Sequence, residues 1–353
     1  MTGKKVKIIF NDDESDKYVL DGAEIKLDNV SGTAADVEAA LASAGFVTEV
    51  IPLKSSQRDR IGAFIEKVTS DDTIVFNLCE GAFGKSAFEM NIAALLELYG
   101  VKFTGSGPLT LGLSLNKGLT KDILHSREIM TPEYCIMEEP PARLKRNLKF
   151  PLIVKPLKED ASIGIDSGAV VNTMKALKKR VEHLISTYKQ PAIVEEYIDG
   201  REFNIAVIGN GKQTRALPPS EIEFVDFPEG APKICCYEAK WVTASPLYQK
   251  TVPSCPANVP DSLKDELQSI ALRAYETMGC RDYARVDMRL GEEGNIKVLE
   301  VNPNPDVSPD AGLARAARAV GLDYPALIAG IVESAAERYG VSGICSKEVL
   351  HCG

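Results

Sequence analysis

The first third of the chain alternates short apolar runs with amphipathic stretches. Two stretches, one capped by Thr33 and one from Phe88 to Tyr99, space their apolar residues as a helix does. Short apolar runs around them predict four strands, at Val6–Phe10, Val47–Leu53, Thr73–Leu78 and Val101–Thr104. Strands that alternate with helices in this way form parallel sheets with helices on both faces. The pattern therefore predicts an N-terminal α/β domain.

The remaining two thirds mix strands and helices less regularly. The predicted helices are Asn116–Ser126, Thr173–Thr187, Asp261–Met278 and Pro325–Tyr339. The predicted strands are Leu152–Pro156, Ala192–Ile198, Glu202–Ile208 and Ala216–Phe224, with Gly200 as a break and a hairpin turn at Gly209–Gly211. The stretch Pro228–Pro260 holds six prolines and little periodicity, which is typical of a functional lid or a disordered segment. Residues 341–353 are interpreted as a loose tail.

Length and charge narrow the class of protein. The 353 residues predict two or three domains, and the net charge of −9 argues against a partner such as nucleic acid or a membrane surface, which rewards clustered Lys and Arg. No apolar run approaches the ~18 residues of a membrane span, and the start carries no signal-peptide core. The eight cysteines include no C-x-x-C pair. We therefore expect a cytoplasmic protein.

Two glycine-rich segments partly match nucleotide-binding loops. In Gly81–Ser86 only two residues separate the glycines where a P-loop has four, and Cys79 stands where the first glycine is needed. The segment nevertheless follows a strand that we expect to be parallel, and ligands bind at such ends. In Gly105–Gly107 the third glycine of a dinucleotide fingerprint is missing, since Thr110 takes its place. We interpret the first segment as lining a site and the second as a tight turn.

The strongest chemical pattern is a predicted hairpin near the C-terminus. In Tyr283–Leu290 and Ile296–Asn302, alternation places polar residues on one face of each strand. If Asp287 pairs with Glu300, then Arg285 falls opposite Asn302. Two carboxylates and an amide oxygen are suited to Mg²⁺, which takes few protein oxygens and leaves positions for phosphates. The alternative is a solvated charged face, but directly opposed carboxylates repel, which favours a cation.

Two lysines are candidates for the same chemistry. Lys155 ends the apolar run Leu152–Val154, and Lys240 lies within the long proline-rich stretch. A single lysine is more often a solvated charge than a ligand. Because its strand is apolar enough to be buried, Lys155 is the better candidate.

Several segments together resemble the ATP-grasp superfamily, and most closely the D-alanine-D-alanine ligases. The resemblance runs from about Val101 to about Ser334. Its motifs are Phe103–Gly107, Asn116-Lys117, Lys155 with the loop Glu159–Gly164, Val194–Phe203, Ala284–Asp287 and Leu299–Pro303.

The resemblance implies an ATP-grasp fold, combining α/β and α+β parts, with an N-terminal Rossmann-like pre-ATP-grasp domain. It divides the chain into residues 1–112, a small lid subdomain at 113–200, and a C-terminal domain at 201–340 with the metal and substrate sites, before the tail at 341–353. The ATP contacts it implies are Lys117, Lys155, Ser162, Glu195, Tyr197, Ile198 and Glu202. The metal ligands it implies are Asp287, Glu300 and Asn302, holding Mg²⁺ or Mn²⁺. Lys240 matches a loop lysine that reaches the γ-phosphate, and Arg285 the residue that stabilises the oxyanion.

The implied reaction is an ATP- and Mg²⁺-dependent ligation of a carboxylate to an amine through an acyl phosphate. No protein nucleophile is needed, so catalysis comes from positioning and charge. The long loop would close and exclude water. The resembled ligases also imply a homodimer. An acyl-phosphate-forming kinase and a non-catalytic nucleotide-binding protein are the alternatives.

The chain departs from the resembled ligases where those bind their substrates. Ala161 and Trp241 replace the Ser and Tyr of their first substrate site, and Ala311 replaces a Ser that holds the second substrate's carboxylate. Asp306 replaces a glycine beside the metal, and Glu80 falls in the altered start of their second loop. A lost hydrogen bond to a small zwitterion costs much affinity. We therefore predict amino-acid or dipeptide-like substrates other than two D-alanines.

The candidate substrate contacts are Trp241, Asp306 and Glu80. Asp310 and the acidic loop at 12–14 are further groups that would attract an amine or a polyol. Each has a structural alternative: Asp310 as the cap of a helix formed by 311–320, and the loop as a solvated segment.

Overall fold

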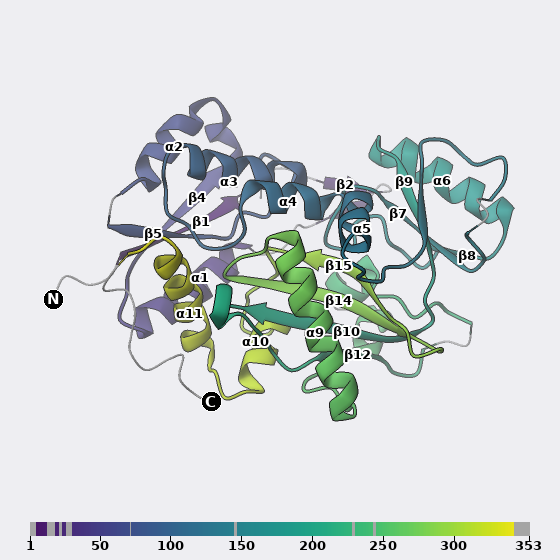
Figure 1. Cartoon of the computed structure of the whole chain (residues 1–353). Helices are drawn as coiled ribbons and strands as arrows, with labels where there is room; N and C mark the ends of the chain where they lie inside the picture. The colour runs from purple at the N-terminus through teal and green to yellow at the C-terminus, as the bar shows by residue number, and fades with distance from the viewer. Residues whose placement is uncertain are drawn as a thin grey trace.

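The computed structural model of the chain describes residues 5–12, 18–20, 23–25, 30–70, 72–144, 147–227, 230–242 and 245–341. Most of the predicted tail and of the acidic loop therefore lie outside the described residues. Figure 1 shows three parts: an N-terminal α/β part, a small sheet, and a larger antiparallel sheet. None of the helices in the described ranges has both the length and the apolar character that crossing a bilayer requires.

The N-terminal sheet is parallel, as predicted. Its order is β4 (Val47–Lys54), β1 (Lys5–Asp12) and β5 (Thr73–Asn77). Successive residues of β1 point to opposite faces, so Ile8 joins the core on the side of α1 (Val30–Ser43) and Ile9 joins the core under α2 (Ile61–Val68) and α3 (Glu89–Leu98). The turn η1 (Ser55–Arg60) leads into α2, and η2 (Ser86–Phe88) precedes α3. A separate two-stranded pair is formed by β2 (Tyr18–Leu20) and β3 (Ala23–Ile25).

Two predictions for this part are wrong. Helix α1 begins at Val30, so Thr33 lies inside the helix instead of capping it. The run 101–104 forms no strand, because only Phe103 bridges to Val75 at the edge of the sheet. The chain then turns into α4 (Pro108–Leu115), where a proline at the first helical position favours the start of a helix.

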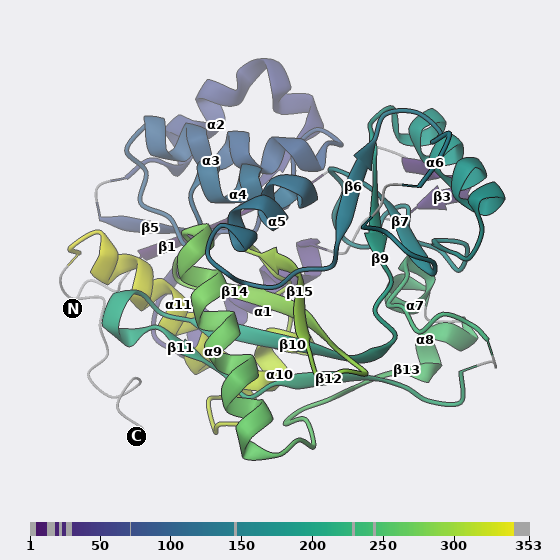
Figure 2. The ribbon, with the colours of Figure 1, turned by 45° about the vertical axis from the view of Figure 1, so that its right-hand side comes forward.

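The small sheet is antiparallel, with the order β6 (Tyr134–Met137), β9 (Ala192–Glu196), β7 (Leu152–Pro156) and β8 (Val170–Val171). Helix α6 (Met174–Tyr188) covers one face and buries Leu177, Val181 and Leu184 against β7 and β9. Figure 2 shows this unit standing apart from the parallel N-terminal sheet and its helices, with α5 (Lys117–His125) between them. Its other face points toward the larger sheet, which leaves a space between two antiparallel sheets.

The larger sheet has the order β13 (Thr251–Ser254), β12 (Ser220–Phe224), β10 (Gly200–Ile208), β14 (Tyr283–Gly291) and β15 (Ile296–Asn302), with β11 (Arg215–Ala216) paired to β10. Helix α9 (Asp261–Met278) packs on it. Gly200 starts β10 instead of separating strands, and a Cβ there would lie 2.0 Å from the Leu290 carbonyl oxygen.

Two further expectations are corrected in this sheet. The predicted strand 216–224 is split, because Pro218 and Pro219 supply no N–H for a ladder. The hairpin expected at Gly209–Gly211 is present with a longer link: β10 and β11 pair antiparallel, with Ile208 opposite Arg215, and the short 3-10 helix η3 (Gly211–Gln213) lies between them. The proline-rich stretch is also structured where it is described, since it contains α7 (Tyr237–Trp241), α8 (Pro246–Lys250) and β13.

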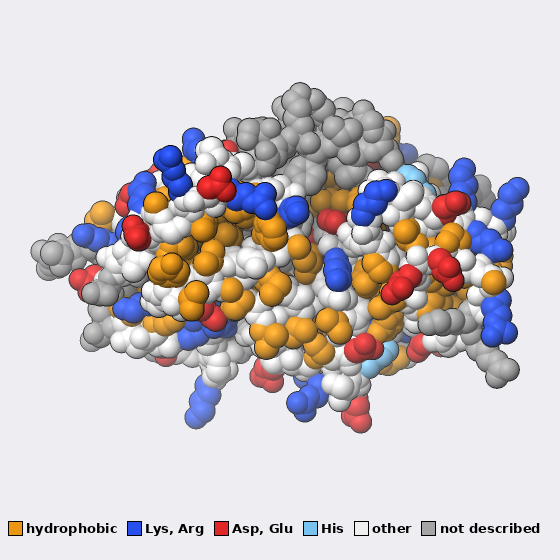
Figure 3. Space-filling model, turned by 90° about the horizontal axis from the view of Figure 1, so that it is seen from above, with side chains coloured by type: hydrophobic (Ala, Val, Ile, Leu, Met, Phe, Trp, Pro, Cys, Tyr) orange, Lys and Arg blue, Asp and Glu red, His pale blue; other side chains and the backbone are white. Residues whose placement is uncertain are grey.

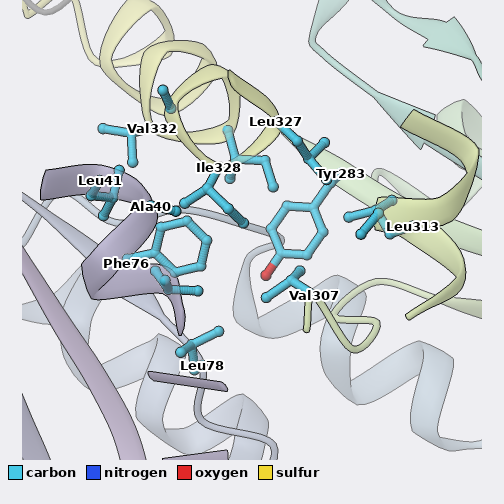
Figure 4. Close-up of a cluster of buried hydrophobic side chains, with 14 of the residues drawn as sticks. Ala40, Leu41, Phe76, Leu78, Tyr283, Val307, Leu313, Leu327, Ile328 and Val332 are labelled. Carbon is cyan, nitrogen blue, oxygen red and sulfur yellow. The ribbon is translucent and has the colours of Figure 1, made fainter. Parts of the chain in front are cut away.

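The C-terminal helices join the N-terminal part to the larger sheet. Helices α10 (Gly312–Arg318) and α11 (Tyr324–Arg338) bring Leu313, Leu327 and Ile328 into one core with Phe76 of β5 and Tyr283 of β14 (Figure 4). The described residues thus give both α/β and α+β parts, which confirms the predicted fold class. The boundaries at residues 112 and 200 stay predictions.

We expect Ile328→Ala to lower the free energy of unfolding by about 2–5 kcal/mol, because Ile328 is fully buried where the N-terminal part meets the larger sheet. Urea unfolding followed by circular dichroism measures the change. Val320→Ala is the control, since Val320 is 46% exposed and its truncation should change stability by less than about 0.5 kcal/mol. Equal losses in the two variants would contradict the shared core.

Candidate active site

The hairpin of β14 and β15 has the predicted register. Arg285 lies opposite Asn302, and Asp287 lies opposite Glu300. The Arg285 guanidinium donates two hydrogen bonds to Asp287, at 2.7 Å from Nε and 2.8 Å from Nη2, and Nη2 lies 3.8 Å from Glu300. Asn204 of β10 donates a third hydrogen bond to Asp287 at 2.7 Å. Four polar groups therefore converge on one face of the sheet, as predicted, although a β-bulge that the sequence did not indicate shifts the register between Met288, opposite Val298, and Asp287.

The two carboxylates of this cluster, Asp287 and Glu300, differ in how readily they ionise. Burial raises the pKa of Asp287, against the opposing effect of Arg285, and the neighbouring Glu300 raises it further. Burial also acts on Glu300, but the charges of Lys240, Lys117 and Arg285 hold its pKa below the usual range. Glu300 is thus the carboxylate most ready to meet a cation at neutral pH.

The donor set fits a hard divalent cation. Across the described residues, no cluster of three or more His, Cys, Asp and Glu side chains could hold a metal. The candidate set has only two carboxylates, and its third oxygen is the Asn302 amide, which is held in place by a 2.9 Å hydrogen bond from the Asn304 N–H. Few protein oxygens on a rigid hairpin suit Mg²⁺ that also binds phosphates.

Two lysines meet one buried glutamate on the small sheet. Lys155 of β7 lies 3.0 Å from Glu195 Oε2, and Lys121 of α5 lies 3.3 Å from Glu195 Oε1. The side chains of Lys121 and Glu195 are each 1% exposed. Burial acts against the charge of Glu195, yet the two lysines hold its pKa below the usual value. Sequence reasoning missed Lys121, whose only signal is its place four residues after Lys117 on the same helix.

A narrow cavity of about 90 Å³ lies between the small and the larger sheet. Most of the predicted ATP contacts line it: Lys155, Ser162, Glu195, Tyr197, Ile198 and Glu202, together with Lys240 from α7. Glu202 is bound by Arg289, whose Nη2 lies 2.6 Å from Oε2, and Arg289 Nη1 also donates to the Ile198 carbonyl at 2.7 Å. Arg289 is a second residue that sequence reasoning missed, although it shares a strand face with Arg285 and Asp287.

The loop after β7 is held in a strained form at the mouth of this cavity. Ala161 and Ser162 have φ values of +53° and +62°, in the left-handed region that non-glycine residues rarely adopt. The Ser162 hydroxyl donates to the Cys235 carbonyl at 2.9 Å, which ties the loop to the segment before α7. Lys117 donates to the Glu159 carbonyl from the other side. Strained backbone of this kind often marks a ligand-binding loop.

A second cavity, of about 600 Å³, opens where the three parts meet. Lys240, Arg285 and Asp287 line it, and so do the predicted substrate residues Glu80 and Asp306. The side chain of Trp241 lies outside the described residues. Asp310 also lines the cavity, but it does not cap α10, because its carboxylate accepts a hydrogen bond from Ser308 at 3.1 Å and the cap position is Ala311.

Glu89 is a further acid in this cavity that sequence reasoning missed. It is the first residue of α3, and its Oε1 accepts a 2.9 Å hydrogen bond from Asn304, which in turn accepts one from the Tyr283 hydroxyl at 2.8 Å. Burial raises the pKa of Glu89 to about 8, and Asp160 adds to the effect. No local sequence pattern predicts that Glu89 belongs to the site, because its hydrogen-bonding network comes from β14 and the loop after β15.

Cys79 follows β5 at the edge of the same region. Its side chain is buried, and its carbonyl accepts a hydrogen bond from Asn304 at 3.2 Å. The end of the parallel strand therefore meets the loop beside the proposed metal ligands. The following residues Glu80, Gly81, Lys85 and Ser86 line the large cavity, in agreement with the interpretation of Gly81–Ser86 as part of a site.

Comparison with known proteins identifies the family. A family model described as "D-ala D-ala ligase C-terminus" matches residues 127–333. A D-alanine–D-alanine ligase from Marinomonas is 32% identical over 88% of this chain and 95% of its own length. A Sinorhizobium fredii protein described as uncharacterized is 37% identical over 77% of each chain. The Bacillus anthracis D-alanine–D-alanine ligase complexed with ATP superposes with a TM-score of 0.71, at 21% identity, over 96% of this chain and 100% of its own. With the two-sheet cavity and the hairpin cluster, these matches place the chain in the D-alanine–D-alanine ligase family of ATP-grasp proteins, as an ATP-dependent carboxylate–amine ligase.

Proposed function

We propose that the protein joins a carboxylate to an amine through an acyl phosphate, and that its substrates are amino-acid or dipeptide-like and are not two D-alanines. A carboxylate oxygen attacks the γ-phosphorus of ATP, the bond to the β–γ bridging oxygen breaks, and ADP leaves. The amine nitrogen then attacks the acyl carbon, loses a proton, and expels phosphate. The observation that carries the proposal is the hairpin cluster of Arg285, Asp287, Glu300 and Asn302 at the junction of the two cavities.

The nucleotide would lie between the two antiparallel sheets. Its adenine and ribose would meet Glu195, Tyr197, Ile198 and Glu202 in the narrow cavity, which those residues line. Its phosphates would meet lysine ammonium groups and the strained loop. The phosphate contacts we assign are Lys117, Lys155, Ser162 and Lys240.

Asp287, Glu300 and Asn302 would hold Mg²⁺ or Mn²⁺. A divalent cation bound there neutralises charge on the phosphates. Arg285 would stabilise the oxyanion that forms when the amine attacks, because its guanidinium reaches from the metal ligands into the large cavity. Lys240 comes from α7 and lines both cavities, so closure of that segment over the nucleotide would exclude water from the acyl phosphate.

The size and lining of the large cavity support substrates other than two D-alanines. Its volume of about 600 Å³ falls in the range of pockets for drug-sized ligands. Ala161 and Ala311 line it with methyl groups, while Glu80 and Asp306 add acids. Such a lining favours a bulkier substrate that carries an amine. Trp241 would add a flat apolar surface.

A matrix of acids and amines tests the proposal. We expect ADP release to require both a carboxylate and an amine, and the product to be an amide by mass spectrometry. D-alanine as both partners should be turned over more slowly than the preferred pair. ADP release with any acid alone, with hydroxylamine trapping the acyl phosphate and no amine dependence, would contradict the ligase and favour a kinase.

We also propose a cytoplasmic homodimer. Hydrophobic side chains are numerous on the face seen in Figure 3. Helices α3 and α4 are adjacent, and they expose Leu98 (78% exposed) and Leu109 (73%), together with Tyr99 directly after α3. We expect light scattering to give twice the chain mass, and Leu98→Glu with Leu109→Glu to give the monomer. Val320→Glu, on a different exposed site, should leave the dimer intact. A wild-type monomer would contradict this assembly.

A further inference from the structure

Arg315 lines the large cavity from helix α10, away from the proposed phosphate contacts. It lies one helical turn after Ala311, and its N–H donates to the Ala311 carbonyl at 3.0 Å. Residues four apart share a helix face, so Arg315 and Ala311 face the cavity together. Between them Gly312 leaves further room, because a Cβ there would meet nothing within 4 Å.

The guanidinium has no carboxylate partner among the described residues. Its only hydrogen bond in that part of the chain runs from Nη1 to the Asp310 carbonyl at 3.1 Å, and Nε is buried without an acceptor. Arg285, by contrast, is bound by Asp287 on two atoms. A buried donor without an acceptor is costly, and a guanidinium offers a fork that matches a carboxylate.

None of the groups that act on the charge of Arg315 forms an ion pair with its guanidinium, which leaves the guanidinium available to a ligand. Burial lowers its pKa, and the nearby Arg318 acts in the same direction. Cys255, in the segment after β13, and Asp310 act the other way. The Cys255 thiol is itself kept neutral, because burial raises its pKa. The Asp310 carboxylate is engaged by Ser308 and forms no ion pair with Arg315.

We infer that Arg315 binds the carboxylate of the amine substrate, so that the acceptor is an amino acid or a peptide and not a simple amine. The inference rests on the proposed ligase function. Arg285 would act at the acyl carbon, and Arg315 would bind the carboxylate at the other end of the acceptor. The acids Asp306 and Asp310 line the cavity near that helix, which gives an amino-acid zwitterion groups of both charges to meet.

The test compares an acceptor with its own carboxamide. The amine partner is first found in a matrix of common L- and D-amino acids, and its carboxamide is then assayed with the same acid partner. For the wild type we expect kcat/KM to be about 10- to 100-fold higher with the carboxylate form, the value expected of charge-assisted hydrogen bonds. Arg315→Met should lower that preference to about 1, by raising KM while kcat changes little, and Arg315→Lys should keep part of it.

Arg318→Met is the matched control. Arg318 is on the same helix, is exposed, and donates to the Pro309 carbonyl without lining the cavity. It should leave the preference unchanged. A wild type that uses the carboxamide as well as the carboxylate would overturn the inference without any variant, and so would an Arg315→Met enzyme that keeps the preference. Absence of any amine-dependent ADP release would instead overturn the ligase function itself.

Discussion

Glu300→Gln should lower kcat by about 1,000-fold or more, because it removes the carboxylate that is most strongly held in its charged form beside Asp287. The substitution keeps the size of the side chain and its place on β15. It leaves Asp287 bound to Arg285 and Asn204, so the fold should persist. ADP release at saturating acid and amine measures the effect.

The matched control for this variant is Glu293→Gln, in the turn of the same hairpin. Glu293 is exposed, and its one hydrogen bond among the described residues is accepted from Asn295 at 3.3 Å, so the change of charge there should alter kcat by less than twofold. Raising Mg²⁺ should restore part of the Glu300→Gln activity, since the remaining ligands bind the cation more weakly. Full activity of Glu300→Gln would exclude Glu300 as a metal ligand.

The hairpin could be predicted from the sequence in part, because its turn is short and a period of two places Arg285, Asp287 and Arg289 on one face of β14. Counted from the turn, Met288 pairs with Val298, and strict alternation would set Asp287 opposite Leu299. A β-bulge shifts the register by one residue and places Glu300 there instead, so the prediction rested on matching the polar residues of the two strands. The parallel N-terminal sheet was equally predictable, since its strands are short apolar runs between helices. In both cases the information is local or nearly so.

The partners of the site residues were not predictable in the same way. Lys121 meets Glu195, and Arg289 meets Glu202, across 74 and 87 positions of the chain. Lys121 reaches Glu195 because α5 lies beside the small sheet, and Arg289 reaches Glu202 because β14 pairs with β10 in the larger sheet, where the two residues are directly opposite. Glu89 of α3 joins the site through Asn304, in the loop after β15, because the N-terminal part packs against the larger sheet. The sequence therefore indicates candidate binding residues, and tertiary packing decides which charges neutralise one another.

Two predictions, the start of α1 and the strand at residues 101–104, were wrong because the local sequence is compatible with more than one structure. Thr33 has the chemistry of a cap, but the helix begins three residues earlier. Val101 and Phe103 are buried apolar residues, yet their segment lies at the edge of the sheet and forms only one bridge, from Phe103 to Val75. A cap residue and an apolar run are each compatible with more than one structure, and the neighbouring elements decide between them.

Glu195→Gln should lower the free energy of unfolding by about 3–5 kcal/mol, because it leaves two lysines facing a neutral amide in a buried site. Lys121 is 1% exposed and Lys155 is 11% exposed, so water cannot replace the lost carboxylate. Glu196→Gln is the matched control. Its carboxylate is 35% exposed and pairs with Lys297 at 2.6 Å, so its loss should cost about 0–1 kcal/mol.

The pH dependence of the same variant gives a second readout. The lysines hold the pKa of Glu195 in the folded protein below its usual value of 4.5. The stabilisation that the carboxylate supplies is therefore fully present above about pH 5 and is lost as the pH falls through the lower folded value. The difference in urea midpoint between wild type and Glu195→Gln should be largest at neutral pH and shrink on acidification. Adding Lys121→Met to Glu195→Gln should recover part of the stability, because it removes one of the two unpaired charges; a further loss in the double variant would show that Lys121 is stabilised by groups other than Glu195.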